Sequence, residues 1–219
     1  MLQVHVCNRW SQSKINNLQL AFFNGVGMET WENVWGIWNQ MTDRDCHATE
    51  MVASILRKFS SLVTSYLWTP FYKTLQEDNL IFASQWPGTG NTTLTLWTLI
   101  NRSGKDINGS QLEVLHNENN KYYDLWHGIE LHPEIRDGKA FLQFPIEKHG
   151  FGAILSGKEK DLPKDFDHFM LKMKQNSERP LSSYPDTNIV FNQKMVPIGP
   201  SKQYKNAPQG KTLKVTSLV

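Results

Sequence analysis

The hydrophobic period of this chain changes near residue 79, and that change constrains the fold more than any other feature. Before it, apolar residues recur three and four positions apart, which is typical of amphipathic helices. After it, short runs rich in β-branched and aromatic residues alternate with Gly, Pro and Asn turns. The chain is 39% hydrophobic, which suffices to bury a core. We therefore expect an α/β part followed by an all-β part.

The α/β part is predicted as strand, helix, strand, helix over residues 2–6, 11–23, 26–29 and 42–63. Gly25 marks the stop of the first helix, and Thr42 with Asp45 resembles a capping box at the start of the second. Alternating strands and helices favour parallel pairing. Two parallel strands do not make a domain, because such a sheet needs cover on both faces.

The all-β part predicts an antiparallel β-sandwich over residues 79–157. In the run "TLTLWTLI", alternation predicts Leu94, Leu96 and Ile100 on one face and Trp97 on the other. Residues 158–179 are expected to add a helix, since apolar residues recur at helical spacing from 165 to 173. Residues 180–219 contain spaced prolines and predict an extended linker.

The stretch "NGVGMETWENVWGIWNQ" holds the main candidates for a site. Glu29 ends a predicted strand, and working residues of α/β proteins lie at the carboxyl ends of strands. Trp31, Trp35 and Trp38 are spaced by four and three, so we expect them on one face of a helical turn, where Trp31 and Trp35 would stack on sugars. Asn24 would support hydroxyl groups or carboxylates there.

A purely structural interpretation of this stretch stays open, in which the tryptophans fill a junction and the glutamates bind backbone N–H groups. Glu32 is the secondary catalytic candidate. Glycoside cleavage requires two carboxyl groups facing each other across the bond, roughly 5–9 Å apart. Glu29 and Glu32 leave one strand end together, so the partner of Glu29 is expected on another strand, and we expect this chain alone to be inactive.

Other chemistries find little support in the sequence. His132 and His149 are not at metal-ligand spacing, His127 is expected to be a packed or surface histidine, and no metal or cofactor is predicted. The net charge of +2 gives no reason to expect nucleic acid as a partner. No run of eighteen apolar residues predicts a membrane span. The compartment stays open, because no signal-peptide pattern is present and the three glycosylation sequons occur at about the chance rate.

Four blocks of the chain, taken in order, resemble one region of certain large proteins of the formylglycine-generating-enzyme (sulfatase-modifying-factor) family. The blocks are "AFFNGVGMETWENVWGIWNQMTDRD", "TLWTLINRSGKDINGSQLEV", "YYDLWHGIELHPE" and "FLQFPIEKHGFGAIL". The segment "KMVPIGP" with "NAPQG" resembles the linker before the last domain of those proteins. The resemblance covers residues 5–210.

The resemblance implies that residues 1–70 are the last βα units of an incomplete glycosidase-like (β/α)8 barrel, followed by the β-sandwich of residues 79–157. Residues 158–179 become a helical extension, and 180–219 a linker toward a formylglycine-generating-enzyme-like domain. Carbohydrate and the neighbouring domains are the implied partners. The alternative is a scaffold or glycan-binding module that positions the oxidase domain. Cys7 and Cys46 do not match the copper-binding pair of that domain, so formylglycine formation by this chain is not expected.

Overall fold

The computed structural model of the chain describes most residues up to Tyr184. The described ranges are 6–8, 13–30, 33–34, 37–38, 41–76 and 80–184, with only the backbone described at 6–8, 30, 33–34 and 37–38. All of these belong to one unit, Met1–Asn188, and the second unit, Ile189–Val219, contains none of them. Most of the predicted linker therefore lies outside the described residues.

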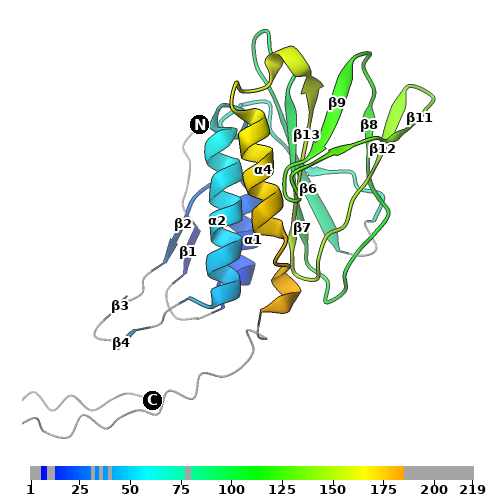
Figure 1. Ribbon diagram of the computed structural model, residues 1–219. Coiled ribbons are helices and arrows are strands. Elements are labelled where there is room, and N and C mark those ends of the chain that lie inside the picture. Colours follow the sequence, from blue (N-terminus) through cyan, green and yellow to red (C-terminus); the bar gives the residue numbers. More distant parts are fainter. Residues whose placement is uncertain are drawn as a thin grey trace, which may run out of the picture. The chain divides into compact units, whose positions relative to one another are not determined.

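A six-stranded antiparallel sheet forms the centre of the described unit (Figure 1). Its strand order is β10-β9-β13-β7-β6-β5, so β7 pairs with β13 on one side and β6 on the other. The strands are β5 Thr69–Tyr72, β6 Ile81–Pro87, β7 Thr95–Asn101, β9 Asn120–Asp124, β10 Ile129–Leu131 and β13 Phe151–Lys158.

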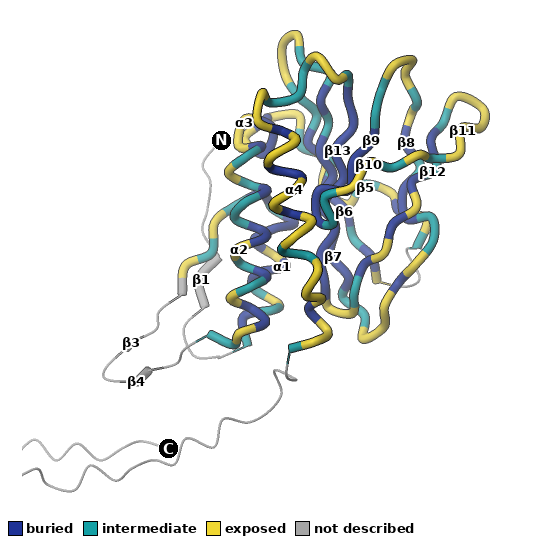
Figure 2. The backbone as a smooth tube through the Cα atoms, in the orientation of Figure 1, coloured by how far each residue is buried: buried dark blue, intermediate teal, exposed yellow. Residues whose placement is uncertain are grey.

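Both faces of this sheet are buried, and alternate residues of β7 contribute to two different cores. Leu94, Leu96 and Ile100 belong to the cluster on the helical side, as the alternation predicts. Trp97 and Leu99 belong to the cluster on the opposite side. Figure 2 shows β7 and β13 as buried along most of their length. The prediction for the two faces of this run is confirmed.

A three-stranded antiparallel sheet covers the side of the large sheet away from the helices (Figure 1). Its order is β11-β12-β8, with β8 Ser110–Leu115, β11 Glu134–Arg136 and β12 Lys139–Gln143. Leu112 and Leu142 are paired across β8 and β12, and both are fully buried against Ile154 of the large sheet's core. The antiparallel sheets predicted after residue 79 are thus confirmed.

Helices cover the other face of the large sheet (Figure 1). They are α1 Ile15–Phe23, α2 Asp43–Lys58, α3 Ser60–Val63 and α4 Phe166–Ser177, with short 3-10 helices η2 Glu159–Asp161 and η3 Leu181–Ser183. Their apolar residues share one cluster, in which Phe22, Met51, Ile55 and Met173 are fully buried. The helix that follows the sheets in sequence therefore packs with those that precede them.

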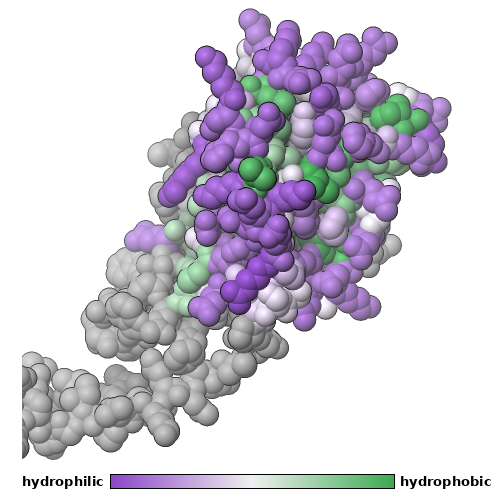
Figure 3. Space-filling view, viewed as in Figure 1, coloured by the Kyte–Doolittle hydropathy of each residue, from purple (hydrophilic) through white to green (hydrophobic). Residues whose placement is uncertain are grey.

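The start of α2 has the N-cap half of the predicted capping box, because the Thr42 hydroxyl accepts a hydrogen bond from the Asp45 N–H at 3.2 Å, while the Asp45 carboxylate accepts from Lys14. The predicted helix of residues 42–63 is divided at Phe59, which is the C-cap of α2 and the N-cap of α3. Figure 3 shows mostly hydrophilic side chains on the outward face of the described residues, with hydrophobic ones in small separate patches. This face is typical of helices that bury only one side.

The predicted parallel pair is present as β1 Val6–Asn8 and β2 Met28–Thr30, with Cys7 opposite Glu29. The predicted strand of residues 2–6 meets the observed one only at residue 6, and residues 2–5 lie outside the described part. Beyond β2, Asn33–Val34 (β3) and Ile37–Trp38 (β4) pair as antiparallel strands. The expectation of a helical turn is therefore wrong at Trp38, whose backbone is extended in a ladder.

Candidate functional site

Glu29 lies on β2 one residue before its carboxyl end, and its side chain is exposed. Its strand neighbour at the same level is Cys7 of β1. No described residue forms an ion pair or hydrogen bond with the Glu29 carboxylate. The side chain is therefore accessible at the strand end where α/β proteins carry their working residues.

Asn24 is not brought to Glu29. It is the C-cap of α1, and its side-chain amide donates a hydrogen bond to the Leu20 carbonyl at 2.8 Å. The next residue, Gly25, has a φ of +61°, and a Cβ there would lie 2.8 Å from the Trp86 ring. Asn24 and Gly25 thus make the turn between α1 and β2. Trp31, Glu32 and Trp35 lie outside the described residues.

A buried polar cluster joins the amino-terminal ends of α1 and α2. The Asp45 carboxylate accepts the backbone N–H of Lys14 at 2.6 Å and the Arg44 guanidinium at 3.4 Å. Arg44 also donates to the His149 carbonyl at 2.8 Å, and burial lowers the pKa of Arg44 despite the nearby carboxylates. These groups are paired with one another or with backbone, so the cluster holds the helices to the loop before β13.

Glu147 anchors the end of the described chain. Its two carboxylate oxygens accept the backbone N–H groups of Leu181 and Ser182 at 2.9 and 2.8 Å, at the start of η3. Tyr184 then stacks on His47 of α2 with ring centroids 5.5 Å apart, and Arg179 lies over the Tyr184 ring. The sequence did not indicate this anchoring, because it depends on residues more than thirty positions apart.

Asp124, at the end of β9, forms a partly buried pair with His127 in the turn that leads to β10. Asp124 is fully buried and accepts the backbone N–H groups of Trp126 and His127 at 3.0 and 3.1 Å. Its second oxygen lies 2.6 Å from His127 Nδ1. Burial lowers the pKa of His127, but the hydrogen bond and charge of Asp124, with the charge of Glu147, outweigh burial and leave that pKa raised.

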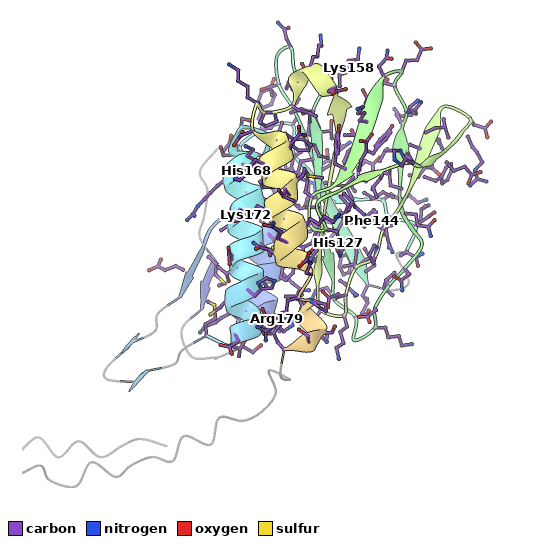
Figure 4. The ribbon with its side chains drawn as sticks, viewed as in Figure 1. His127, Phe144, Lys158, His168, Lys172 and Arg179 are labelled. Carbon is purple, nitrogen blue, oxygen red and sulfur yellow. The ribbon has the colours of Figure 1, made fainter. Side chains whose placement is uncertain are left out.

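This pair orders a turn that packs closely on α4. A Cβ on Gly128 would lie 2.2 Å from the Met170 carbonyl oxygen, and the residue has a φ of +63°. Figure 4 shows His127 beside α4. The expectation that His127 is a packed or surface histidine is confirmed, since its ring serves the turn and is only 24% exposed.

A small pocket of about 90 Å³ opens beside the three-stranded sheet. Its walls come from the connection between β10 and β11, from β12 and from the first residue of β8. The lining residues are Ser110, Leu131, His132, Pro133, Glu134, Phe141 and Gln143. The sequence did not indicate this pocket, because its residues come from three separate segments.

The described residues contain no group of three or more His, Cys, Asp or Glu side chains able to hold a metal ion. Among the same residues, no helix is both long and apolar enough to cross a membrane.

Comparison with known proteins gives only distant likenesses. No family model matches the chain, and no curated protein matches it, so the resemblance to the formylglycine-generating-enzyme family finds no support there. A glycoside hydrolase family 30 subfamily 8 xylanase, Xyn30A, from Clostridium acetobutylicum is similar over 71% of this chain and 42% of its own, with 11% identity and a TM-score of 0.38.

An α-amylase from Anoxybacillus is similar over 66% of this chain and 33% of its own, with 14% identity and a TM-score of 0.39. The chain therefore spans less than half the length of either structure. Both neighbours are described as glycoside hydrolases, but likenesses this weak carry no argument about activity.

Proposed function

We propose that this chain is the carbohydrate-active, glycosidase-like region of a longer, multidomain protein. In this proposal residues 1–70 are the last βα units of a (β/α)8 barrel, residues 79–157 its β-sandwich and 158–179 a helical extension. Residues 180–219 lead to a further domain. The observation that carries the proposal is the parallel β1–β2 pair, because α1 connects its two strands and an exposed carboxylate lies near the carboxyl end of β2.

Glu29 is the proposed catalytic carboxylate, with Glu32 as the second candidate. Trp31 and Trp35 are the proposed sugar platforms, and Asn24 supports the site only indirectly, through the turn that precedes β2. Cleavage of a glycoside needs a second carboxyl group about 5–9 Å from the first. We propose that it comes from a barrel strand outside residues 1–219, so that the chain by itself does not hydrolyse sugars.

The first test is to sequence the full transcript and to express its whole product. We expect six more βα units before residue 1 and hydrolysis of aryl glycosides by the complete protein. Glu29→Gln should lower kcat about 10²–10⁴-fold, the range for loss of a general acid or base. Glu118→Gln is the matched control, because Glu118 is exposed between β8 and β9 and has no partner among the described residues.

If the complete protein hydrolyses glycosides and its Glu29→Gln variant is equally active, Glu29 is not the catalytic carboxylate. A complete barrel that hydrolyses no glycoside would remove the glycosidase proposal itself.

A scaffold function is the second candidate, and the buried cluster around Asp45 favours it. The polar side chains at the ends of α1 and α2 are committed to structural hydrogen bonds, which suits a rigid support. In this case the chain positions a formylglycine-generating-enzyme-like oxidase domain that follows residue 219. The same transcript tests it, since a downstream domain without a copper-binding cysteine pair would rule out that partner.

A further inference from the structure

We propose that the pocket beside the three-stranded sheet binds one residue of a neutral saccharide. This inference goes beyond the proposed function, because the pocket lies on β8, β12 and the β10–β11 connection and shares no residue with the Glu29 site. It holds whether or not Glu29 is catalytic. Four features of the pocket support this assignment: its backbone, its free hydrogen-bonding groups, its charge balance and its size.

The pocket is built by fixed backbone. Leu131 ends β10 and Glu134 begins β11, so only His132 and Pro133 connect the two strands. A proline restricts φ, which limits the conformations of so short a connection. On the opposite wall, the register shift between Leu142 and Gln143 sets Gln143 opposite Ser110. That irregularity brings two polar side chains from different strands to the same wall.

Three side chains of the pocket have hydrogen-bonding capacity that the described residues do not use. The Ser110 hydroxyl, the His132 ring and the Gln143 amide make no hydrogen bond to any other described side chain or backbone group. Ser110 contributes only its carbonyl, which accepts from Gln76 at 3.2 Å. A hydroxyl, an imidazole ring and a carboxamide can each both donate and accept hydrogen bonds. Sugar hydroxyls also do both, so they match this set of groups.

The charges at the pocket are balanced within the protein. Glu134 pairs with Arg136 at 3.1 Å, and the Arg136 guanidinium lies 4.3 Å from the centre of the Phe141 ring. On the next strand pair, Lys139 pairs with Glu113. An anion would meet the Glu134 carboxylate of the lining, and the pair with Arg136 already balances that carboxylate against a cation, so a neutral ligand suits the pocket best.

The apolar lining and the volume suit a single sugar ring. Most of the accessible lining is polar, and Leu131, Pro133 and Phe141 add a smaller nonpolar part against which the C–H groups of a pyranose can pack. The volume is about 90 Å³, and one bound water needs roughly 10–15 Å³ of such space. The pocket therefore holds several waters or one ring, and a longer chain would extend into solvent.

The test is a titration of the ¹⁵N-labelled whole chain, followed by amide NMR shifts. Cellohexaose, xylohexaose, mannohexaose and maltohexaose are each added to about 10 mM. We expect at least one of them to give saturable amide shifts at Leu131, His132, Glu134 and Gln143, with a Kd on the order of 1 mM. His132→Ala and Gln143→Ala should each raise that Kd about two- to tenfold, because each removes a group that hydrogen-bonds the ligand.

Two matched controls make the same chemical changes elsewhere. His168→Ala and Gln175→Ala alter exposed residues of α4, on the opposite layer of the molecule, and should leave the Kd unchanged (Figure 4 labels His168). Glu29→Gln should also leave it unchanged. If Glu29→Gln abolishes hydrolysis by the complete protein but leaves the Kd at the pocket unchanged, the pocket binds saccharide independently of the Glu29 site.

Three results would overturn the inference. The first is the absence of saturable shifts with all four oligosaccharides. The second is binding that the pocket variants and the controls weaken equally, which would put the ligand elsewhere. The third is tighter binding of an oligogalacturonate than of any neutral oligosaccharide, which would contradict the charge argument.

Discussion

The turn between β9 and β10 offers a sharp test of how the hairpin meets α4. Gly128 has a φ of +63°, and a Cβ there would lie 2.2 Å from the Met170 carbonyl oxygen and 2.5 Å from the Lys174 backbone nitrogen. These are backbone atoms of a helix, so they cannot rotate aside as the end of a side chain can. Gly128→Ala must therefore strain the turn and also push the hairpin away from α4.

Gly138 separates these two effects. It lies in the turn between β11 and β12 with a φ of +72°, and nothing lies within 4 Å of the position of its Cβ. Gly138→Ala therefore lowers the free energy of unfolding only by the cost of the left-handed backbone conformation, about 1–2 kcal/mol. Gly128→Ala adds overpacking, about 1–3 kcal/mol more. The total for Gly128→Ala is then about 2–5 kcal/mol.

Urea unfolding followed by tryptophan fluorescence measures both variants. With an m value of about 2 kcal/mol/M, the extra loss at Gly128 lowers the midpoint by about 0.5–1.5 M relative to Gly138→Ala. If the Gly128→Ala chain does not fold while the Gly138→Ala chain does, the result also supports the close approach of the turn to α4. Equal losses, within about 0.5 kcal/mol, would refute the close approach of the turn to α4.

Three further predictions concern the core and the buried pairs. The pKa of His127 is raised above 6.5 in the folded chain, so its pair with Asp124 stabilises the fold fully below about pH 6.5 and less as pH rises through the folded pKa. Urea unfolding from about pH 5.5 to 8.5 should show the advantage of wild type over His127→Gln shrinking with pH, and a constant advantage would contradict this. Met173 is fully buried on α4, so Met173→Ala should lower the free energy of unfolding in urea by about 2–5 kcal/mol. Leu171 is 54% exposed on the same helix, and Leu171→Ala should lower it by well under half as much. Gln19→Ala removes buried hydrogen bonds to the Asn101 and Gly150 carbonyls and should lower the free energy of unfolding by about 2–3 kcal/mol in the same assay. Asn16 is exposed on the same helix, so Asn16→Ala is the control. If both variants lose the same free energy of unfolding, these hydrogen bonds do not hold α1 to the sheet.

Local hydrophobic periodicity in the sequence was enough to predict most of the helices and strands. The alternation in β7 predicted which side chains face each core, since neighbouring side chains of a strand must point to opposite faces. The capping pair Thr42 and Asp45 predicted the start of α2 for an equally local reason. The position of Glu29 near a strand end also follows from its own short segment.

Contacts between distant segments were decided only by the tertiary structure. The packing of α4 with α1 and α2, and the use of Glu147 to anchor η3, join residues that no sequence window contains together. The Asn24 side chain turns back onto α1, where its amide donates to the Leu20 carbonyl that also accepts the Asn24 backbone N–H. The pocket exists because a shift of register sets Gln143 opposite Ser110. Periodicity specifies which face of an element is apolar, but which faces meet depends on the free energy of packing the whole chain.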